Sequence, residues 1–120
     1  MAIKRNADAA VKIEVGLPLK DIRSIEFLFK KEKNPACPEL LKKGYRAEEI
    51  EVFDDESVEN GFVMLMRLKP EETYRLTVGK VYMDTYAVLN DGTAPNIPIV
   101  PIDNIQQTLY NEVHRNDNTG

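Results

Sequence analysis

Apolar and polar residues alternate with a period of two along most of this chain. Val11, Ile13 and Val15 alternate with Lys12 and Glu14, a pattern that gives a β-strand one apolar face and one charged face. The strands that this alternation predicts are 10–15, 25–29, 45–53, 62–68, 80–89 and 97–102.

Segment 62–68 is the most apolar of the predicted strands. Both of its faces are apolar until Arg67, which predicts a central position in its sheet. The sequences Asn-Gly at 60–61 and Asn-Asp-Gly at 90–92 favour tight turns before this strand and after the strand 80–89. The order of elements is therefore strand, turn, strand, without alternating helices.

The stretch between the second and third predicted strands does not alternate. Residues 30–34 form a charge run that is predicted to be solvated, and Pro35 and Pro38 disfavour a strand ladder. Glu39–Lys43 is predicted to form one helical turn, with Gly44 as its C-cap.

Prolines interrupt the last β segment at every third position. Because Pro95, Pro98 and Pro101 cannot donate ladder hydrogen bonds, this segment is predicted to be an edge strand or a polyproline-like arm. The following residues, 103–115, have a helical spacing of apolar positions and are predicted to form a C-terminal helix or arm.

These elements predict an all-β fold, an antiparallel β-sandwich of about seven strands with a short C-terminal helical segment. A small barrel is the alternative. The chain of 120 residues is predicted to be a single domain, residues 1–120, with 1–9 and 116–120 flexible. The sequence leaves open whether 95–115 pack on their own core or on a neighbouring molecule.

Composition narrows the range of partners. Apolar residues make up 42% and charged residues 30% of the chain, and the net charge is −4. An acidic surface argues against nucleic acid or an anionic membrane as the partner. Apolar runs of at most five residues predict neither a secretory signal nor a membrane span. The single cysteine fits a reducing compartment or a particle assembled inside a cell.

The residues that carry chemistry are few. The chain has one cysteine, Cys37, one histidine, His114, and the serines Ser24 and Ser57, and no base is placed beside a nucleophile. One cysteine and one histidine do not make the usual zinc sites. We therefore expect no catalytic residue, no metal site, no cofactor and no enzyme activity.

A cluster of carboxylates follows the third predicted strand. Asp54, Asp55, Glu56 and Glu59 are expected to form an acidic turn, with a weak calcium site as the alternative. They lack the spacing of a calcium-loop motif.

Three tyrosines are candidates for structural or binding roles. Tyr74 is placed like the tyrosine corner of immunoglobulin-type sandwiches, with half-buried packing as the equal alternative. Tyr82 and Tyr86 share one face of the strand 80–89, with Asp84 between them. Such a pair is either a binding platform or is covered by a loop or terminal arm.

Five short motifs resemble a known family. They are Ala10–Val15, Ile22–Phe27, Glu71–Leu76, Gly79–Asp84 and Leu89–Ala94. Together they are similar to small immunoglobulin-like structural proteins encoded by phages and prophages of Gram-positive bacteria. The resemblance covers about two-thirds of the chain and excludes the triple-proline strand and the C-terminal segment. It implies an immunoglobulin-like sandwich and a virion protein of the tail or baseplate, able to oligomerise, with no catalytic residues.

The function predicted first is therefore a non-catalytic structural or interaction module that binds proteins or further copies of itself. The residues expected to make these contacts are Tyr82, Tyr86, Ile97, Ile99, Ile105, Leu109 and Val113. One alternative is a small acidic regulator or inhibitor that binds a host protein through the acidic face Asp54, Asp55, Glu56 and Glu59. A second alternative is a carbohydrate-binding module, which the lack of tryptophan disfavours.

Overall fold

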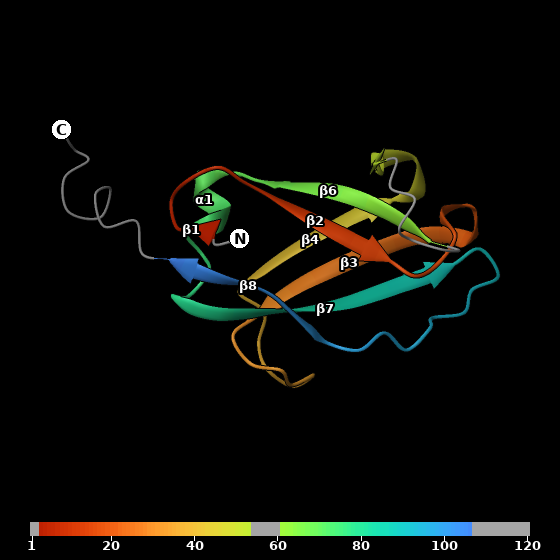
Figure 1. Cartoon of the computed structure of the whole chain (residues 1–120). Helices are drawn as coiled ribbons and strands as arrows, with labels where there is room; N and C mark the ends of the chain where they lie inside the picture. The colour runs from red at the N-terminus through yellow and green to blue at the C-terminus, as the bar shows by residue number, and fades with distance from the viewer. Residues whose placement is uncertain (1–2, 54–60, 107–120) are drawn as a thin grey trace.

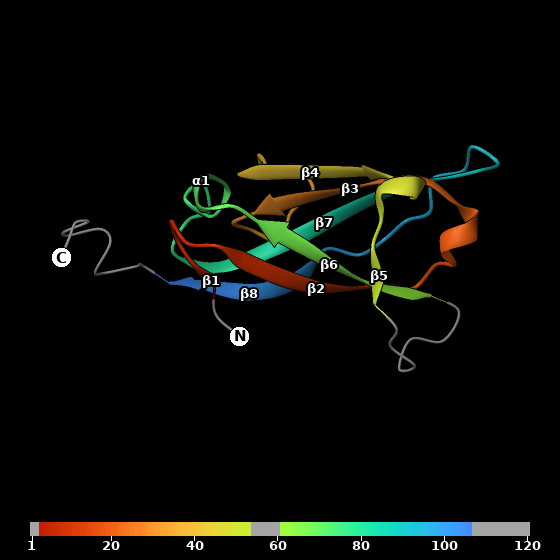
Figure 2. The same cartoon turned by 90° about the horizontal axis from the view of Figure 1, so that it is seen from above.

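The computed structural model describes residues 3–53 and 61–106, which fold into two stacked β-sheets (Figures 1 and 2). The larger sheet has the strand order β1 (Ile3–Lys4), β8 (Val100–Gln106), β7 (Gly79–Leu89), β3 (Ile22–Lys30) and β4 (Leu41–Arg46). The smaller sheet has the order β2 (Ala9–Val15), β6 (Phe62–Leu68) and β5 (Val52–Phe53). All these neighbours are antiparallel except β1 and β8. Three helical turns complete the fold: η1 (Leu19–Asp21), η2 (Ala47–Glu49) and α1 (Pro70–Thr73).

The predicted all-β fold with two antiparallel sheets is confirmed. The central position predicted for segment 62–68 is also confirmed, because β6 lies between β2 and β5. An immunoglobulin-like topology is not confirmed. In the constant-type immunoglobulin fold the first two strands are neighbours in one sheet. Here the first two long strands, β2 and β3, lie in opposite sheets, and β3 lies between β7 and β4.

The core lies between the sheets and is built by the alternation seen in the sequence. Phe27 of β3 is fully buried, and it is paired in register with Thr85 of β7 and Lys43 of β4. The smaller sheet supplies the opposite wall from the inward positions of β2 and β6. The buried apolar side chains of the core from β2, β3, β4, β6 and β7 are Val11, Ile13, Val15, Ile22, Ile25, Phe27, Phe29, Leu41, Phe62, Met64, Met66, Leu68, Val81, Met83 and Ala87.

Several sequence predictions were wrong near the middle of the chain. The predicted strand 45–53 is divided into the end of β4, the turn η2 and the short strand β5. Residues predicted to form a helical turn, Glu39–Lys43, instead lead into β4, whose Leu41 pairs with Phe29. Gly44 is not a C-cap but lies within this strand, opposite Glu26. Pairing with β3 along six positions overrides the weak local helical preference.

The chain ends differ from their predictions as well. Residues 103–106, predicted to begin a helix, belong to strand β8. Within the segment 1–9 that was expected to be flexible, Ile3–Lys4 pairs with β8 and Ala9 begins β2. Residues 107–120 lie outside the described residues.

Strand β8 pairs with only part of β7. The register runs from Gly79 with Ile105 to Met83 with Val100, and it shifts by a bulge between Val81 and Tyr82, whose partners are Asp103 and Pro101. Residues 93–99, called the strap below, precede β8 and form no strand ladder. Because Pro95 and Pro98 lack an amide hydrogen, the strap does not continue the ladder along β7 beyond Met83.

The helix α1 lies at the end of the sandwich close to β1 (Figure 1). Thr73 is fully buried, and its hydroxyl accepts a hydrogen bond from the amide of Ala7 at 3.1 Å and donates to its carbonyl at 2.9 Å. The guanidinium of Arg5 lies 4.7 Å from the ring centroid of Tyr74 and also donates to its carbonyl. Tyr74 is 54% exposed, so about half of its surface is covered, and its ring lies beneath Arg5. Within the described residues, no helix has the length and apolar character to cross a membrane.

We expect Phe27→Ala to lower the free energy of unfolding by about 3–5 kcal/mol, because it leaves a cavity in the middle of the core. Urea denaturation followed by circular dichroism measures this loss. The control is Glu26→Ala, one residue away on the exposed face, which should change stability by only about 0.5 kcal/mol. Equal losses for the two variants would contradict the assignment of the core face.

Candidate functional site

The outer face of the five-stranded sheet brings together the polar and aromatic residues of β3 and β7. On β3, Glu26 and Lys30 project to this face, and on β7 the residues Tyr82, Asp84 and Tyr86 do so, because alternate residues of a strand share a face. In the register of the two strands, Glu26 lies opposite Tyr86, and Lys30 lies opposite Tyr82.

A buried ion pair lies on this face. The Nζ atom of Lys30 is 2.8 Å from Oδ2 of Asp84, and the two side chains are only 3% and 6% exposed. Nζ of Lys30 also donates to the carbonyl of Pro35 at 3.0 Å. The prediction that Lys30 belongs to a solvated charge run was therefore wrong.

The loop after β3 carries the carbonyl that completes this arrangement. Asn34 forms a turn in which its side-chain oxygen accepts from the amide of Ala36 at 2.9 Å, and its carbonyl accepts from the amide of Cys37 at 3.0 Å. Cys37 is buried, and the chain returns to β3 through a bond from the amide of Leu40 to the carbonyl of Phe29. The turn at Asn34 thus places the backbone carbonyl of Pro35 within hydrogen-bond distance of Lys30.

Tyr86 extends this network to the surface. Its ring is 48% exposed, and its hydroxyl donates a hydrogen bond to Oδ2 of Asp84 at 3.0 Å. This hydrogen bond, together with the negative charge of Asp84, raises the pKa of Tyr86 above its ordinary value. An exposed aromatic ring is therefore held at its polar end by a carboxylate whose own position is fixed by Lys30.

The surface is hollowed on two sides of Tyr86. One hollow of about 320 Å³ is lined by Glu26, Gly44, Arg46 and Val88, and it lies where Gly44 has no side chain. A second hollow of about 410 Å³ lies between the loop after β3 and the strap, where its lining includes Lys33, Pro35 and Ile99. Tyr86 is the residue common to both.

The predicted contact residues are not brought together as one surface. Tyr82 is partly buried, whereas Tyr86 is exposed, so they do not form an exposed aromatic pair. Ile97 packs against the protein's own core, and Ile99 lines the second hollow beside Tyr86. Ile105 lies in strand β8, opposite Ile3 and Gly79. Leu109 and Val113 lie outside the described residues.

The predicted acidic face also lies outside the described residues, since Asp54, Asp55, Glu56 and Glu59 fall in the interval 54–60. The neighbouring acids Glu48, Glu49 and Glu51 are exposed, and Glu49 accepts a hydrogen bond from the amide of Arg46 at 2.7 Å. In residues 3–53 and 61–106, no group of three or more histidine, cysteine or acidic side chains is placed to hold a metal ion.

Sequence reasoning missed three residues that shape this region: Lys30, Gly44 and Thr85. One signal for Lys30 was available, because Asp84 is the one acid of the strand 80–89 and lies between two tyrosines, and a covered acid needs a cation. Gly44 and Thr85 gave no comparable signal, since their importance depends on which strands they face.

We expect Lys30→Met to lower the free energy of unfolding by roughly 3–5 kcal/mol, because it leaves the carboxylate of Asp84 buried without its cation. The double variant Lys30→Met with Asp84→Leu removes both charges and should recover most of that loss. Urea denaturation of the four proteins of the cycle measures the coupling. The control is Lys42→Met, whose pair with Glu26 is exposed and should contribute less than about 1 kcal/mol. Additive losses in the cycle would contradict a direct ion pair.

We also expect the pKa of Tyr86 to fall toward its ordinary value in the double variant, because the hydrogen bond to Asp84 that raises it is removed. NMR of ring-labelled tyrosines across alkaline pH resolves the residues individually. Tyr45 is the internal control: burial raises its pKa, and its environment lacks Asp84, so its titration should not move. An unchanged Tyr86 titration would show that Asp84 does not hold its hydroxyl.

Comparisons of this chain with protein families, with curated proteins and with solved structures found no match. The resemblance to phage-encoded immunoglobulin-like proteins therefore stays a prediction. We infer the function from the geometry of the chain's own residues.

Proposed function

We propose that this chain is a non-catalytic interaction module that binds a protein partner through the outer face of its five-stranded sheet, with Tyr86 as the anchor residue. The observation that carries the proposal is an exposed tyrosine held by a buried ion pair, Lys30 with Asp84, between two surface hollows. Tyrosine is among the residues that contribute most to protein interfaces, because it combines a large apolar ring with a polar end.

The pre-organisation of Tyr86 supports this role. A side chain that is already fixed loses less conformational entropy when a partner covers it. The hydroxyl of Tyr86 is bonded to Asp84, and Asp84 is fixed by Lys30, which in turn is bonded to Pro35. The hollow at Gly44 leaves room beside the ring for an apolar side chain of the partner.

Charged residues surround the ring on this face. Glu26 and Arg46 line the hollow at Gly44, and Lys42 forms an exposed pair with Glu26 at 3.5 Å. Charges of both signs at the rim suit a partner surface with mixed charges, and they contribute more to orientation than to affinity. This arrangement resembles the polar rim of a protein interface around an aromatic centre.

A protein partner is favoured over a glycan on this face. Carbohydrate-binding β-modules would need a row of exposed aromatic rings, and Tyr82 beside Tyr86 is partly buried. The other exposed tyrosine among the described residues, Tyr74, follows α1 and lies beneath Arg5. The alternative of an acidic regulator rests on the acidic residues of 48–59, among which only Glu48, Glu49 and Glu51 have described side chains, all of them exposed.

The setting that we propose for the module is a phage or prophage particle, as a tail or baseplate protein, on the strength of the resemblance alone. The partner would then be a second copy of this chain or a neighbouring particle protein, in the virion or in the bacterial cytoplasm. An immunoglobulin-like relationship is part of this proposal, and the two-layer antiparallel arrangement supports it, whereas the position of β3 does not. Tail or baseplate genes beside this gene would support the setting.

The anchor is tested by a photo-crosslinking amino acid. We expect benzoylphenylalanine in place of Tyr86 to form one discrete adduct in cells of the source organism. Mass spectrometry of the adduct identifies the partner, and twice the mass of the chain would indicate self-association. The matched control carries the same group in place of Arg67, which is exposed on the smaller sheet. No adduct at position 86, or the same adduct from both positions, would contradict the proposal.

The affinities of two variants for the captured partner then distinguish the contribution of the Tyr86 ring from that of its hydroxyl. Tyr86→Ala should weaken binding by roughly tenfold or more, because the anchor ring is lost. Tyr86→Phe keeps the ring and should weaken binding much less. Equal binding by wild type and Tyr86→Ala would remove Tyr86 from the interface.

A further inference from the structure

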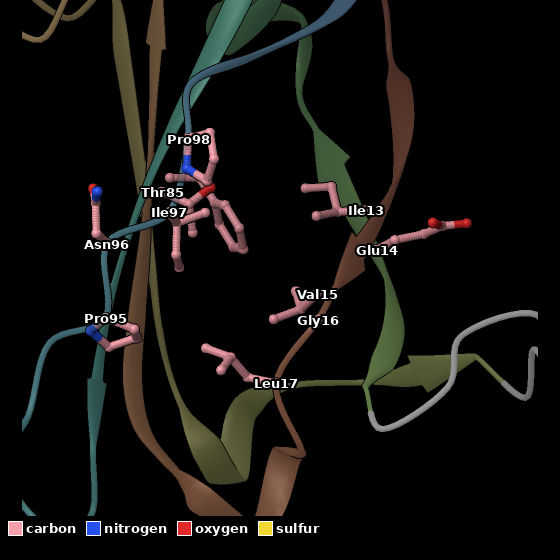
Figure 3. A pocket seen from close by; sticks show the side chains of 11 residues that line it. Ile13, Glu14, Val15, Gly16, Leu17, Thr85, Pro95, Asn96, Ile97 and Pro98 are labelled. Atoms are coloured by element: carbon pink, nitrogen blue, oxygen red, sulfur yellow. The ribbon is translucent and has the colours of Figure 1, made fainter.

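A pocket of about 330 Å³ opens between the two sheets, on the inner side of the strap. Figure 3 shows Ile13, Val15 and Leu17 pointing across this pocket toward Pro95 and Ile97, so both walls are apolar. The pocket exists because the strap leaves the edge of β7 beyond Met83, where β8 ceases to pair. It lies on the opposite face of the larger sheet from Tyr86.

One buried polar side chain lines this pocket. Thr85 is 7% exposed and projects from the inner face of β7, where it is paired with Phe27. Within the described residues its hydroxyl has no hydrogen-bond partner. It lies beside Ile97 and Pro98 on the strap side of the pocket (Figure 3). This hydroxyl oxygen is not among the fully buried polar atoms that lack a partner, so it is open to the pocket, where a ligand group can bond to it in place of water.

The charges around the pocket indicate which ligand fits. Glu14 is the one charged residue among those that line it, and its carboxylate points away from the pocket in Figure 3. Since no cation lines the cavity, an anionic head group would be desolvated there without compensation. The ligand chemistry that suits these walls is neutral and mainly apolar.

The volume of the pocket limits the size of the ligand that it can hold. A dry cavity of about 150 Å³ lined by apolar side chains binds benzene, and small-molecule sites begin near 300 Å³. The volume of about 330 Å³ therefore has room for two fused rings or a short aliphatic chain.

We propose that the pocket between β2 and the strap binds a small, neutral, mainly apolar molecule whose single hydroxyl or carbonyl group bonds to Thr85. The polar group of this site differs from the anchor of the protein-binding face, because Thr85 and Tyr86 are consecutive residues and project to opposite sides of the sheet, although the strap lines both cavities. The strap is the wall that yields on entry, since it is tied to β7 by turn bonds near Leu89 and by no ladder.

The test uses two probes of matched shape, 2-naphthol and 2-methylnaphthalene, titrated into the full chain and followed by amide chemical shifts. We expect both probes to bind and to shift the amides of Val15, Thr85 and Ile97. Thr85→Val should weaken 2-naphthol by about three- to tenfold and leave 2-methylnaphthalene within about twofold, because only the first probe loses a hydrogen bond.

Filling the pocket supplies the second arm. Val15→Trp should abolish binding of both probes, and Ile97→Trp, which changes the strap instead of β2, serves if Val15→Trp does not fold. Tyr86→Ala is the control and should bind both probes as the wild type does, which separates this site from the interaction face. Absence of binding by the wild type, shifts confined to another surface, or unchanged 2-naphthol affinity in Thr85→Val would each overturn the proposal.

Discussion

The backbone of β7 has a ladder partner on both sides for only part of its length. On one side β3 pairs with it from Tyr82 to Leu89, while on the other side β8 pairs only from Gly79 to Met83. The prolines of the strap and of β8 set this limit, because each removes an amide hydrogen that a ladder requires. The strap therefore passes β7 at a distance, and both the hollow beside Tyr86 and the pocket beside Thr85 lie along its course.

The ion pair of Lys30 with Asp84 has a different physical status from the apolar core. Two charges removed from water recover their desolvation cost only when geometry and additional hydrogen bonds are good, and apolar residues of similar size are often as stable. Here the lysine has a second acceptor at Pro35, and the carboxylate has a second donor at Tyr86. Stability alone does not require this ion pair, and its network ends at the exposed Tyr86. We therefore interpret the pair as a means of positioning Tyr86 rather than as a main source of stability.

Periodicity predicted the strands whose two faces differ, and it failed where tertiary pairing decided the outcome. The strands 10–15, 62–68 and 80–89 were predicted within one residue of β2, β6 and β7, because one buried face imposes alternation. Residues 39–43 carry no such signal, and β4 forms there because β3 offers a complementary edge. The helical spacing after residue 103 was likewise misleading, since 103–106 continue a ladder with β7 and β1.

The candidate sites were also predicted only where the pattern along one strand was sufficient, and not where tertiary packing decides the outcome. Tyr86 was named from the sequence because aromatic residues on one strand face are conspicuous, and its exposure agrees with a binding role. Thr85 was placed correctly by alternation on the opposite face from Tyr86, but nothing in the sequence says that the strap would leave its hydroxyl facing a pocket. That property depends on the distance between two segments that are ten residues apart in the chain, and only the folded arrangement of prolines sets it.

Consecutive residues on one strand make the two proposed sites adjacent in the chain and separate in space. Because Thr85 faces the inside of the sandwich and Tyr86 the outside, substituting one side chain leaves the contacts of the other in place. The strap is the element that lies near both, since Pro95, Asn96, Ile97 and Pro98 line the inner pocket and the outer hollow alike. Any displacement of the strap by a molecule in the inner pocket would therefore alter the shape of the hollow beside Tyr86. Coupling between the two sites would pass through these strap residues, because the ladder of β7 with β3 holds Thr85 and Tyr86 in fixed register.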